Sequence, residues 1–205
     1  MNNDSRNNGS AKKVDTLKLV GVSLFTAIVL VLQYLGSFIK LGPFSISLVL
    51  IPIVIGAALY GRAAGAWLGL AFGLAVLISG DAAPFLAINV AGTVIVVLLK
   101  GLLAGLAAGV VYKLVEKLNV TVAVIAAAVV CPVVNTGVFL LGCLVFFMDT
   151  IRTWAEGMGF TNVYGYMILG LVGANFLFEL AFNMVLSPVI VRLIHLGRKA
   201  KLKSV

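Results

Sequence analysis

Lys100, Asn135 and Glu179 each lie near the middle of a long apolar stretch of the sequence. Charged side chains are costly in an apolar environment, so such residues usually face a partner, a cavity or a substrate path. An ammonium group donates hydrogen bonds and attracts anions, whereas a carboxylate accepts hydrogen bonds and attracts cations. Lys100 and Glu179 therefore have two interpretations. They either help to bind a ligand while nearly neutralising each other, or form a buried ion pair that only specifies helix register.

Further polar residues gather around these three. Asn175, Glu179 and Asn183 recur every four residues, which places them on one face of a helix. Asn89 and Thr93 precede the lysine by about three and about two helical turns. Apart from Asn183, these groups lie at the middle of their segments or toward one common side, which predicts a polar cavity open to that side. The candidate ligand-binding residues are Asn89, Thr93, Lys100, Asn135, Asn175 and Glu179.

A polar loop rich in aromatic residues is predicted over 148–166, and it contains Trp154, Phe160, Tyr164 and Tyr166. Aromatic rings stack well on flat ligands. They also gather at membrane–water interfaces, and the sequence leaves both explanations open. We add Trp154 and Tyr164 to the candidate binding residues.

The composition indicates the environment of these residues. Of the 205 residues, 62% are hydrophobic and 11% are charged, whereas soluble domains carry roughly 25% charged residues. Such a chain is typical of a polytopic membrane protein. Apolar runs of about twenty residues without alternation favour helices over a barrel. We predict an all-α bundle of six transmembrane helices over 17–38, 45–60, 63–79, 85–112, 120–147 and 167–194.

The basic residues predict the orientation of the bundle. Arg62, Lys113 and Lys117 fall on the side that holds both ends of the chain, whereas Lys40 and Arg152 fall on the other. Cytoplasmic loops carry the excess of lysine and arginine, so we expect both termini in the cytoplasm and the chain in the plasma membrane. The net charge of +8 then marks cytoplasmic edges, and no nucleic-acid partner is expected. The expected parts are a disordered tail over 1–16, a transmembrane domain over 17–195 and a basic tail over 196–205.

Glycines at four-residue spacing predict that helices approach closely. They are Gly65, Gly69 and Gly73 in the third predicted helix, and Gly101, Gly105 and Gly109 in the fourth. Internal packing is favoured over a partner-binding face for both sets.

The sequence lacks the motifs of several common classes of enzyme. It contains no GxxxxGK[ST] phosphate loop, no HExxH and no GxSxG. Cys131 and Cys143 share one apolar segment and are expected to be packing residues. We therefore predict no catalytic residue, no metal site and no cofactor, and expect that the chain is neither an enzyme nor its own ATPase.

The run LGPFSISLVLIPIVIGAALYGRAAGAWLGLAFG, from Leu41 to Gly73, resembles the substrate-binding S components of energy-coupling factor (ECF) vitamin transporters. The predicted number of helices and the small residues Ser23 and Ala27 on the first helix fit the same family. The resemblance covers about residues 17–195.

The resemblance implies that the domain over 17–195 binds a water-soluble vitamin in its outer half. It implies three protein partners as well, a transmembrane coupling subunit and two ATPase subunits, and delivery by toppling of the S component in the membrane. An Ala-xxx-Ala motif on the first helix contacts the coupling subunit in this family. Ser23 and Ala27 match that motif, with serine in place of the first alanine.

The substrate itself stays open between two vitamins. Riboflavin suits the aromatic rings and the amides of Asn89, Asn135 and Asn175, whereas pantothenate, an anion, suits Lys100. Two other functions are less favoured. A self-sufficient facilitator or channel would show an inverted repeat or a continuous polar lining, but the polar residues thin out toward the cytoplasmic side. A membrane enzyme with Glu179 as base and Lys100 as electrostatic stabiliser would lack a nucleophile.

Overall fold

The computed structural model describes the backbone of residues 4–38, 40–41, 44–45 and 48–203, and the side chains of residues 16–38 and 48–197. The long helices are α1 (Asp4–Gly36), α3 (Arg62–Ser79), α5 (Val90–Val115), α6 (Val120–Phe146) and α9 (Gly173–Lys203). The short ones are α2 (Leu50–Tyr60), α4 (Ala83–Leu86), α7 (Met148–Gly157), α8 (Val163–Gly165) and the π-helix η1 (Tyr166–Leu171). Strands β1 (Lys40–Leu41) and β2 (Phe44–Ser45) pair antiparallel, with Lys40 opposite Ser45.

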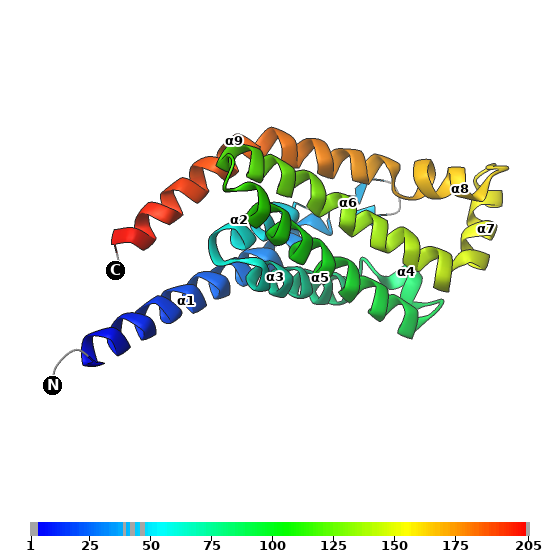
Figure 1. The fold of residues 1–205 in the computed structure, drawn as a ribbon. Coiled ribbons are helices and arrows are strands. Elements are labelled where there is room, and N and C mark those ends of the chain that lie inside the picture. Colours follow the sequence, from blue (N-terminus) through cyan, green and yellow to red (C-terminus); the bar gives the residue numbers. More distant parts are fainter. Residues whose placement is uncertain (1–3, 39, 42–43, 46–47, 204–205) are drawn as a thin grey trace.

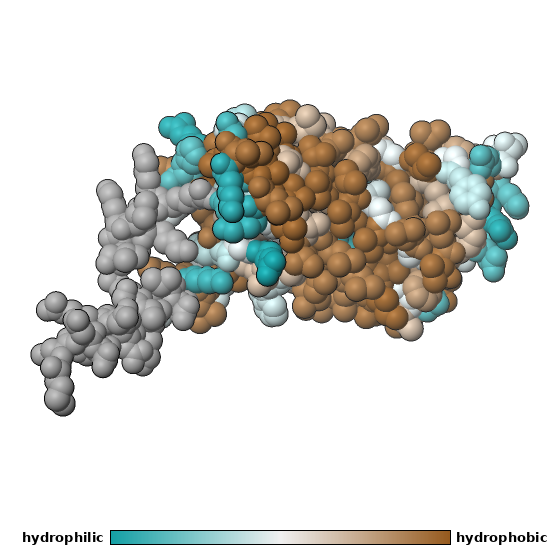
Figure 2. Space-filling view, viewed as in Figure 1, coloured by the Kyte–Doolittle hydropathy of each residue, from teal (hydrophilic) through white to brown (hydrophobic). Residues whose placement is uncertain are grey.

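The described part of the chain contains five helices that are long and apolar enough to cross a membrane. They are α1 from Thr16 onward, α3, α5, α6, and α9 as far as Gly197. Hydrophobic residues cover the side of the bundle that faces the viewer, and hydrophilic residues gather toward its ends (Figure 2). The predicted helical membrane bundle is thereby confirmed.

The second predicted transmembrane segment, 45–60, is shorter than expected. Helix α2 begins at Leu50 and has 11 residues, so it covers about 16 Å at 1.5 Å per residue, about half of the hydrocarbon core of a membrane. Its central residues Ile53, Val54 and Gly56 are buried. It packs against α1, α3, α5, α6 and α9, so the long helices enclose it.

The helix predicted over 85–112 is divided in two near its start. Helix α4 ends at Leu86 and α5 begins at Val90. Asn89 has an extended backbone between them, and its Oδ1 accepts a hydrogen bond of 2.9 Å from the Gly92 N–H. Asparagine is a preferred N-cap because its side chain satisfies an amide that has no partner within the helix. The continuous apolar composition of this stretch conceals the helix start.

Glycines hold α3 and α5 together along most of their length. A Cβ atom built on Gly69 would lie under 3.0 Å from the backbone of Gly101, and one built on Gly65 would meet Gly105 in the same way. Backbone therefore packs directly on backbone, as small residues at four-residue spacing allow. The prediction of internal packing for these glycines is confirmed.

The predicted loop over 148–166 is largely helical, which corrects the sequence-based expectation. Helices α7 and α8 lie across one end of the bundle and lead into η1 (Figure 1). Buried Phe147, Ile151 and Met167 belong to a hydrophobic cluster at this end. The final predicted helix accordingly starts with a π-helical turn at Tyr166, and α9 follows from Gly173.

Helix α1 begins and α9 ends at the same end of the bundle, opposite α4, α7 and α8 (Figure 1). The turn at Arg62 and the end of α5 at Val115 belong to this first end. The tail boundaries at 16 and 195 stay predictions, although α1 already begins at Asp4. Positions 42–43 and 46–47 of the resemblance motif lie outside the described residues, as do the side chains of Lys40 and of the basic tail after residue 197.

Candidate functional site

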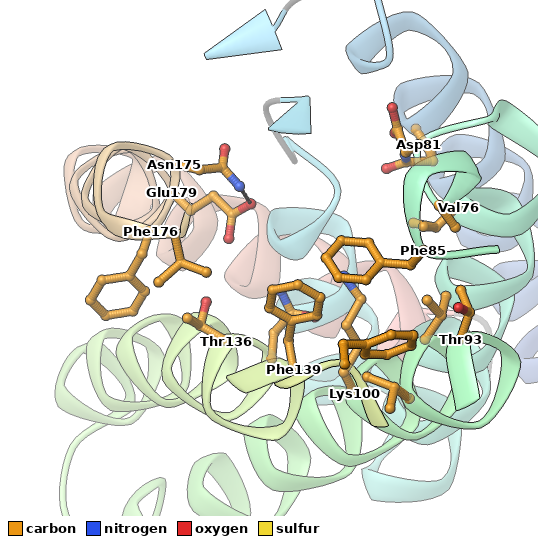
Figure 3. A pocket seen from close by; sticks show the side chains of 17 residues that line it. Val76, Asp81, Phe85, Thr93, Lys100, Thr136, Phe139, Asn175, Phe176 and Glu179 are labelled. Carbon is orange, nitrogen blue, oxygen red and sulfur yellow. Dashed lines mark hydrogen bonds between the residues drawn. The ribbon is translucent and has the colours of Figure 1, made fainter. Parts of the chain in front are cut away.

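A cavity lies between α3, α5, α6 and α9, in the half of the bundle nearest α4 and α7 (Figure 3). About 70 Å³ of it is open to the centres of water molecules, several times the roughly 10–15 Å³ that one water needs. Phenylalanine and valine side chains form much of its wall. The polar residues that line it are Gln33, Asp81, Thr93, Lys100, Asn135, Thr136, Asn175 and Glu179.

Lys100 projects from α5 into the cavity between two aromatic rings. Its Nζ atom lies 5.6 Å from the ring centroid of Phe72 on α3 and 5.5 Å from that of Phe139 on α6. Both distances fall within the range in which a ring face attracts a cation. The glycine contact between α3 and α5 brings Phe72 close to this lysine. The rings therefore hold the ammonium group at the cavity wall without removing it from the cavity.

The opposite wall is formed by the first turns of α9 (Figure 3). Asn175 Nδ2 donates a hydrogen bond of 3.1 Å to Glu179 Oε1, and Glu179 is 2% exposed. The four-residue spacing of these residues predicts that they share a face, and the hydrogen bond confirms it. An amide donor from the same helix thus holds one oxygen of this buried carboxylate.

Lys100 and Glu179 line one cavity, but they are not a close ion pair. Among the described side chains, the ion pairs within 4.0 Å are Lys113–Glu116 and Arg152–Asp149. In Figure 3, Lys100 lies among aromatic side chains on one side of the cavity, whereas Glu179 lies beside Asn175 on the other. The hypothesis that this pair only fixes helix register finds no direct contact to support it.

Two amide oxygens at the cavity have no donor among the described residues. Asn135 is 5% exposed, and neither its Oδ1 nor that of Asn175 accepts a hydrogen bond from any described residue. Buried polar atoms in proteins are nearly always hydrogen-bonded. These two oxygens therefore have unused hydrogen-bonding capacity at the cavity.

A second polar group lies where α1 meets the turn after α3. Gln33 Nε2 donates a hydrogen bond to Asp81 Oδ2, and Ser79 Oγ lies 3.3 Å from the same oxygen. Gln33 is 2% exposed despite its polar side chain. Neither Gln33 nor Asp81 is among the predicted binding residues. A glutamine within an otherwise apolar helix is the signal in the sequence that points to this site.

The predicted site residues separate into two groups. Thr93, Lys100, Asn135, Asn175 and Glu179 come together at the cavity, although they belong to three helices. The remaining three, Asn89, Trp154 and Tyr164, are not among the described residues that line it.

Each of these three has another position in the fold. Asn89 caps α5. Trp154 on α7 packs edge-on against Phe85, with 5.5 Å between the ring centroids. Of these two rings, Phe85 is the one that lines the cavity. Tyr164 on α8 is 58% exposed.

The predicted partner-binding residues lie on the outside of the bundle. Ser23 and Ala27 on α1 are both exposed. Next to Ala27, Trp67 Nε1 donates a hydrogen bond of 3.1 Å to Thr26 Oγ1, which ties α1 to α3. The hydrogen bond to α3 therefore helps to fix the position of the exposed face of α1.

Comparison with known protein families gives a match to the ECF transporter substrate-specific component over residues 17–191. The chain belongs to this family. No significant match to a curated protein or to a solved structure was found. Every residue that lines the cavity, from Gln33 to Glu179, falls within the matched region. The ECF component is thus a multi-pass membrane protein that serves substrate-specific transport, and its cavity belongs to the part shared with the family.

Proposed function

We propose that this protein is the substrate-binding S component of an ECF-type importer, with a water-soluble vitamin, riboflavin or pantothenate, as its substrate. The observation that carries the proposal is the cavity in one half of a membrane bundle. It is lined by Lys100, Glu179 and two asparagine amides, together with several phenylalanine rings. This mixture of apolar walls with a few polar groups is typical of a small-molecule site.

The cavity half of the bundle faces the outside in this proposal, and both termini lie in the cytoplasm of a cell whose plasma membrane holds the protein. Support comes from the basic residues. Arg62, Lys113 and Lys117 lie toward the end at which α1 begins and α9 ends, away from the cavity. Lysine and arginine mark cytoplasmic loops. The substrate then enters from the outer end, near α4 and α7.

The partners are a transmembrane coupling subunit and two ATPase subunits. The face of α1 around Ser23 and Ala27 contacts the coupling subunit, because its small exposed residues allow another helix to approach closely. Between the cavity and the end at which α1 begins, small apolar side chains pack tightly, because Ala104, Ala108 and Ala127 are 0% exposed. A channel through the protein would need a polar path at this position, so we favour delivery with partners over a self-sufficient facilitator.

Two measurements on protein purified in detergent test the proposal. Native mass spectrometry should find a bound vitamin, and a bound flavin would be visible by its absorbance. An affinity tag on this chain should recover the coupling subunit and the ATPases when all subunits are expressed together. A protein that binds no water-soluble vitamin and recovers no coupling subunit would refute the proposal. Uptake by liposomes that contain this chain alone would favour a facilitator.

A further inference from the structure

We propose that the substrate is a small organic anion whose acidic group binds Lys100 and whose N–H or O–H groups bind Asn135 and Asn175. This inference rests on the proposed function, because it takes the cavity to be the substrate site. It goes further by stating which group of the bound molecule faces Lys100 and which groups face the two asparagines. It also decides between the two vitamins, because pantothenate carries a carboxylate, an amide N–H and two hydroxyl groups, whereas riboflavin has no acidic group of this kind.

The first step of the argument concerns the hydrogen bonds of Lys100. An ammonium group carries three donors, and its contacts among the described residues are with the faces of Phe72 and Phe139. A ring face attracts a cation but does not replace a hydrogen-bond acceptor in strength. A charge removed from water needs a partner with good geometry. An anionic group in the cavity supplies that partner.

The second step concerns the two acidic side chains at the cavity, which could instead attract a cation. Asp81 accepts a hydrogen bond from Gln33, and Glu179 accepts one from Asn175. Each carboxylate thus already has one donor within the protein, and Glu179 Oε2, which accepts no hydrogen bond from the described residues, can accept a further N–H or O–H of the substrate. Lys100, by contrast, has described contacts with rings only. We therefore place the negatively charged group of the substrate at Lys100.

The third step concerns the amide oxygens of Asn135 and Asn175. Both are buried at the cavity and accept no hydrogen bond from the described residues. A buried amide oxygen left without a donor loses the hydrogen bonds that it would make to water. A substrate with N–H or O–H groups can donate hydrogen bonds to both oxygens. These oxygens belong to α6 and α9, which both line the cavity (Figure 3).

Apolar residues separate the lysine from the α9 wall. Phe85 and Phe139 line the cavity between Lys100 and Asn175 (Figure 3). The bound molecule therefore places a carbon framework between its acidic end and its donor groups. The proposed substrate class therefore has an acidic group at one end, an apolar middle, and N–H or O–H donors at the other end.

The first experiment needs no variant. Native mass spectrometry identifies the small molecule that remains bound to the wild-type protein, and calorimetric titration in detergent compares pantothenate with pantothenol, its neutral alcohol analogue. We expect an anion in the spectrum. In the titration we expect pantothenate to bind at least about 10-fold more tightly than pantothenol, because a hydrogen bond to a charged group is stronger than one to a neutral group. A neutral bound molecule, or riboflavin bound in preference to pantothenate, would overturn the inference and leave the proposed function standing. Failure to bind any vitamin and to recover the coupling subunit would remove both.

The second experiment tests the role of Lys100. Lys100→Met keeps the length of the side chain and removes its charge, and Lys100→Arg keeps a charge. The control is Lys113→Met on the same helix, because the Lys113 side chain is 74% exposed, away from the cavity. We expect Lys100→Met to lose at least about 10-fold in affinity for the anion, Lys100→Arg to retain part of it and Lys113→Met to match the wild type. Equal affinity in a folded Lys100→Met protein would overturn the inference, and if that variant fails to fold, the wild-type comparison still decides.

Discussion

Gly69→Ala tests the contact between α3 and α5 on which the shape of the cavity depends. The added Cβ would lie under 3.0 Å from both the carbonyl oxygen and the carbonyl carbon of Gly101. These are backbone atoms, so no flexible side chain can move aside and the two helices must separate. Overpacking of this kind costs about 1–3 kcal/mol. Alanine also favours a helix over glycine by about 1 kcal/mol, so we expect a net loss of about 0–2 kcal/mol in the free energy of unfolding.

Gly137→Ala is the matched control. Gly137 lies within helix α6, and no atom is found within 4 Å of a Cβ built on it. This variant has the same gain in helix propensity without overpacking, so it should be as stable as the wild type or more so. The difference between the two variants isolates the packing cost, about 1–3 kcal/mol.

The measurement is the free energy of unfolding in mixed detergent micelles, followed by circular dichroism and extrapolated to zero denaturing detergent. Substrate titration of both variants belongs to the same experiment. Gly69→Ala should also bind substrate more weakly, because Lys100 adjoins Gly101 on α5 and moves with it. Equal stability of the Gly69→Ala and Gly137→Ala proteins would refute the idea that α3 and α5 meet backbone to backbone.

Three further predictions concern the periphery of the site. Ala27→Trp should prevent recovery of the coupling subunit in an affinity pull-down and leave vitamin affinity unchanged; loss of vitamin binding would mean that this face packs internally. Asn89→Ala should lower the free energy of unfolding by about 1 kcal/mol, the value of an N-cap, with unchanged affinity by titration; weaker binding without loss of stability would make Asn89 a ligand contact. Trp154→Ala should lower stability by at least about 0.5–1.5 kcal/mol through loss of its ring pair with Phe85, whereas Tyr164→Ala should change neither stability nor affinity, because that side chain is 58% exposed.

The sequence alone determined the membrane class of this protein, most of its helices and five of the residues that line its cavity. Apolar runs place helices because lipid leaves the backbone no other hydrogen-bond partners. A charge within such a run indicates a functional position, and the four-residue spacing of Asn175 and Glu179 fixes a shared helix face. These are local or one-dimensional properties. The helix start at Asn89 is also local, but the apolar residues on both sides conceal it.

Only the tertiary structure decided which side chains meet across helices. The rings of Phe72 and Phe139 flank Lys100, and Gln33 reaches Asp81, although these residues lie far apart in the chain. Such contacts depend on the rotation and separation of each helix pair, which packing sets. The glycine contact between α3 and α5 is one such determinant, and it places Lys100 beside aromatic rings, across the cavity from the α9 wall. The charge of Lys100 therefore lies at the cavity between two rings, without a close ion pair to Glu179.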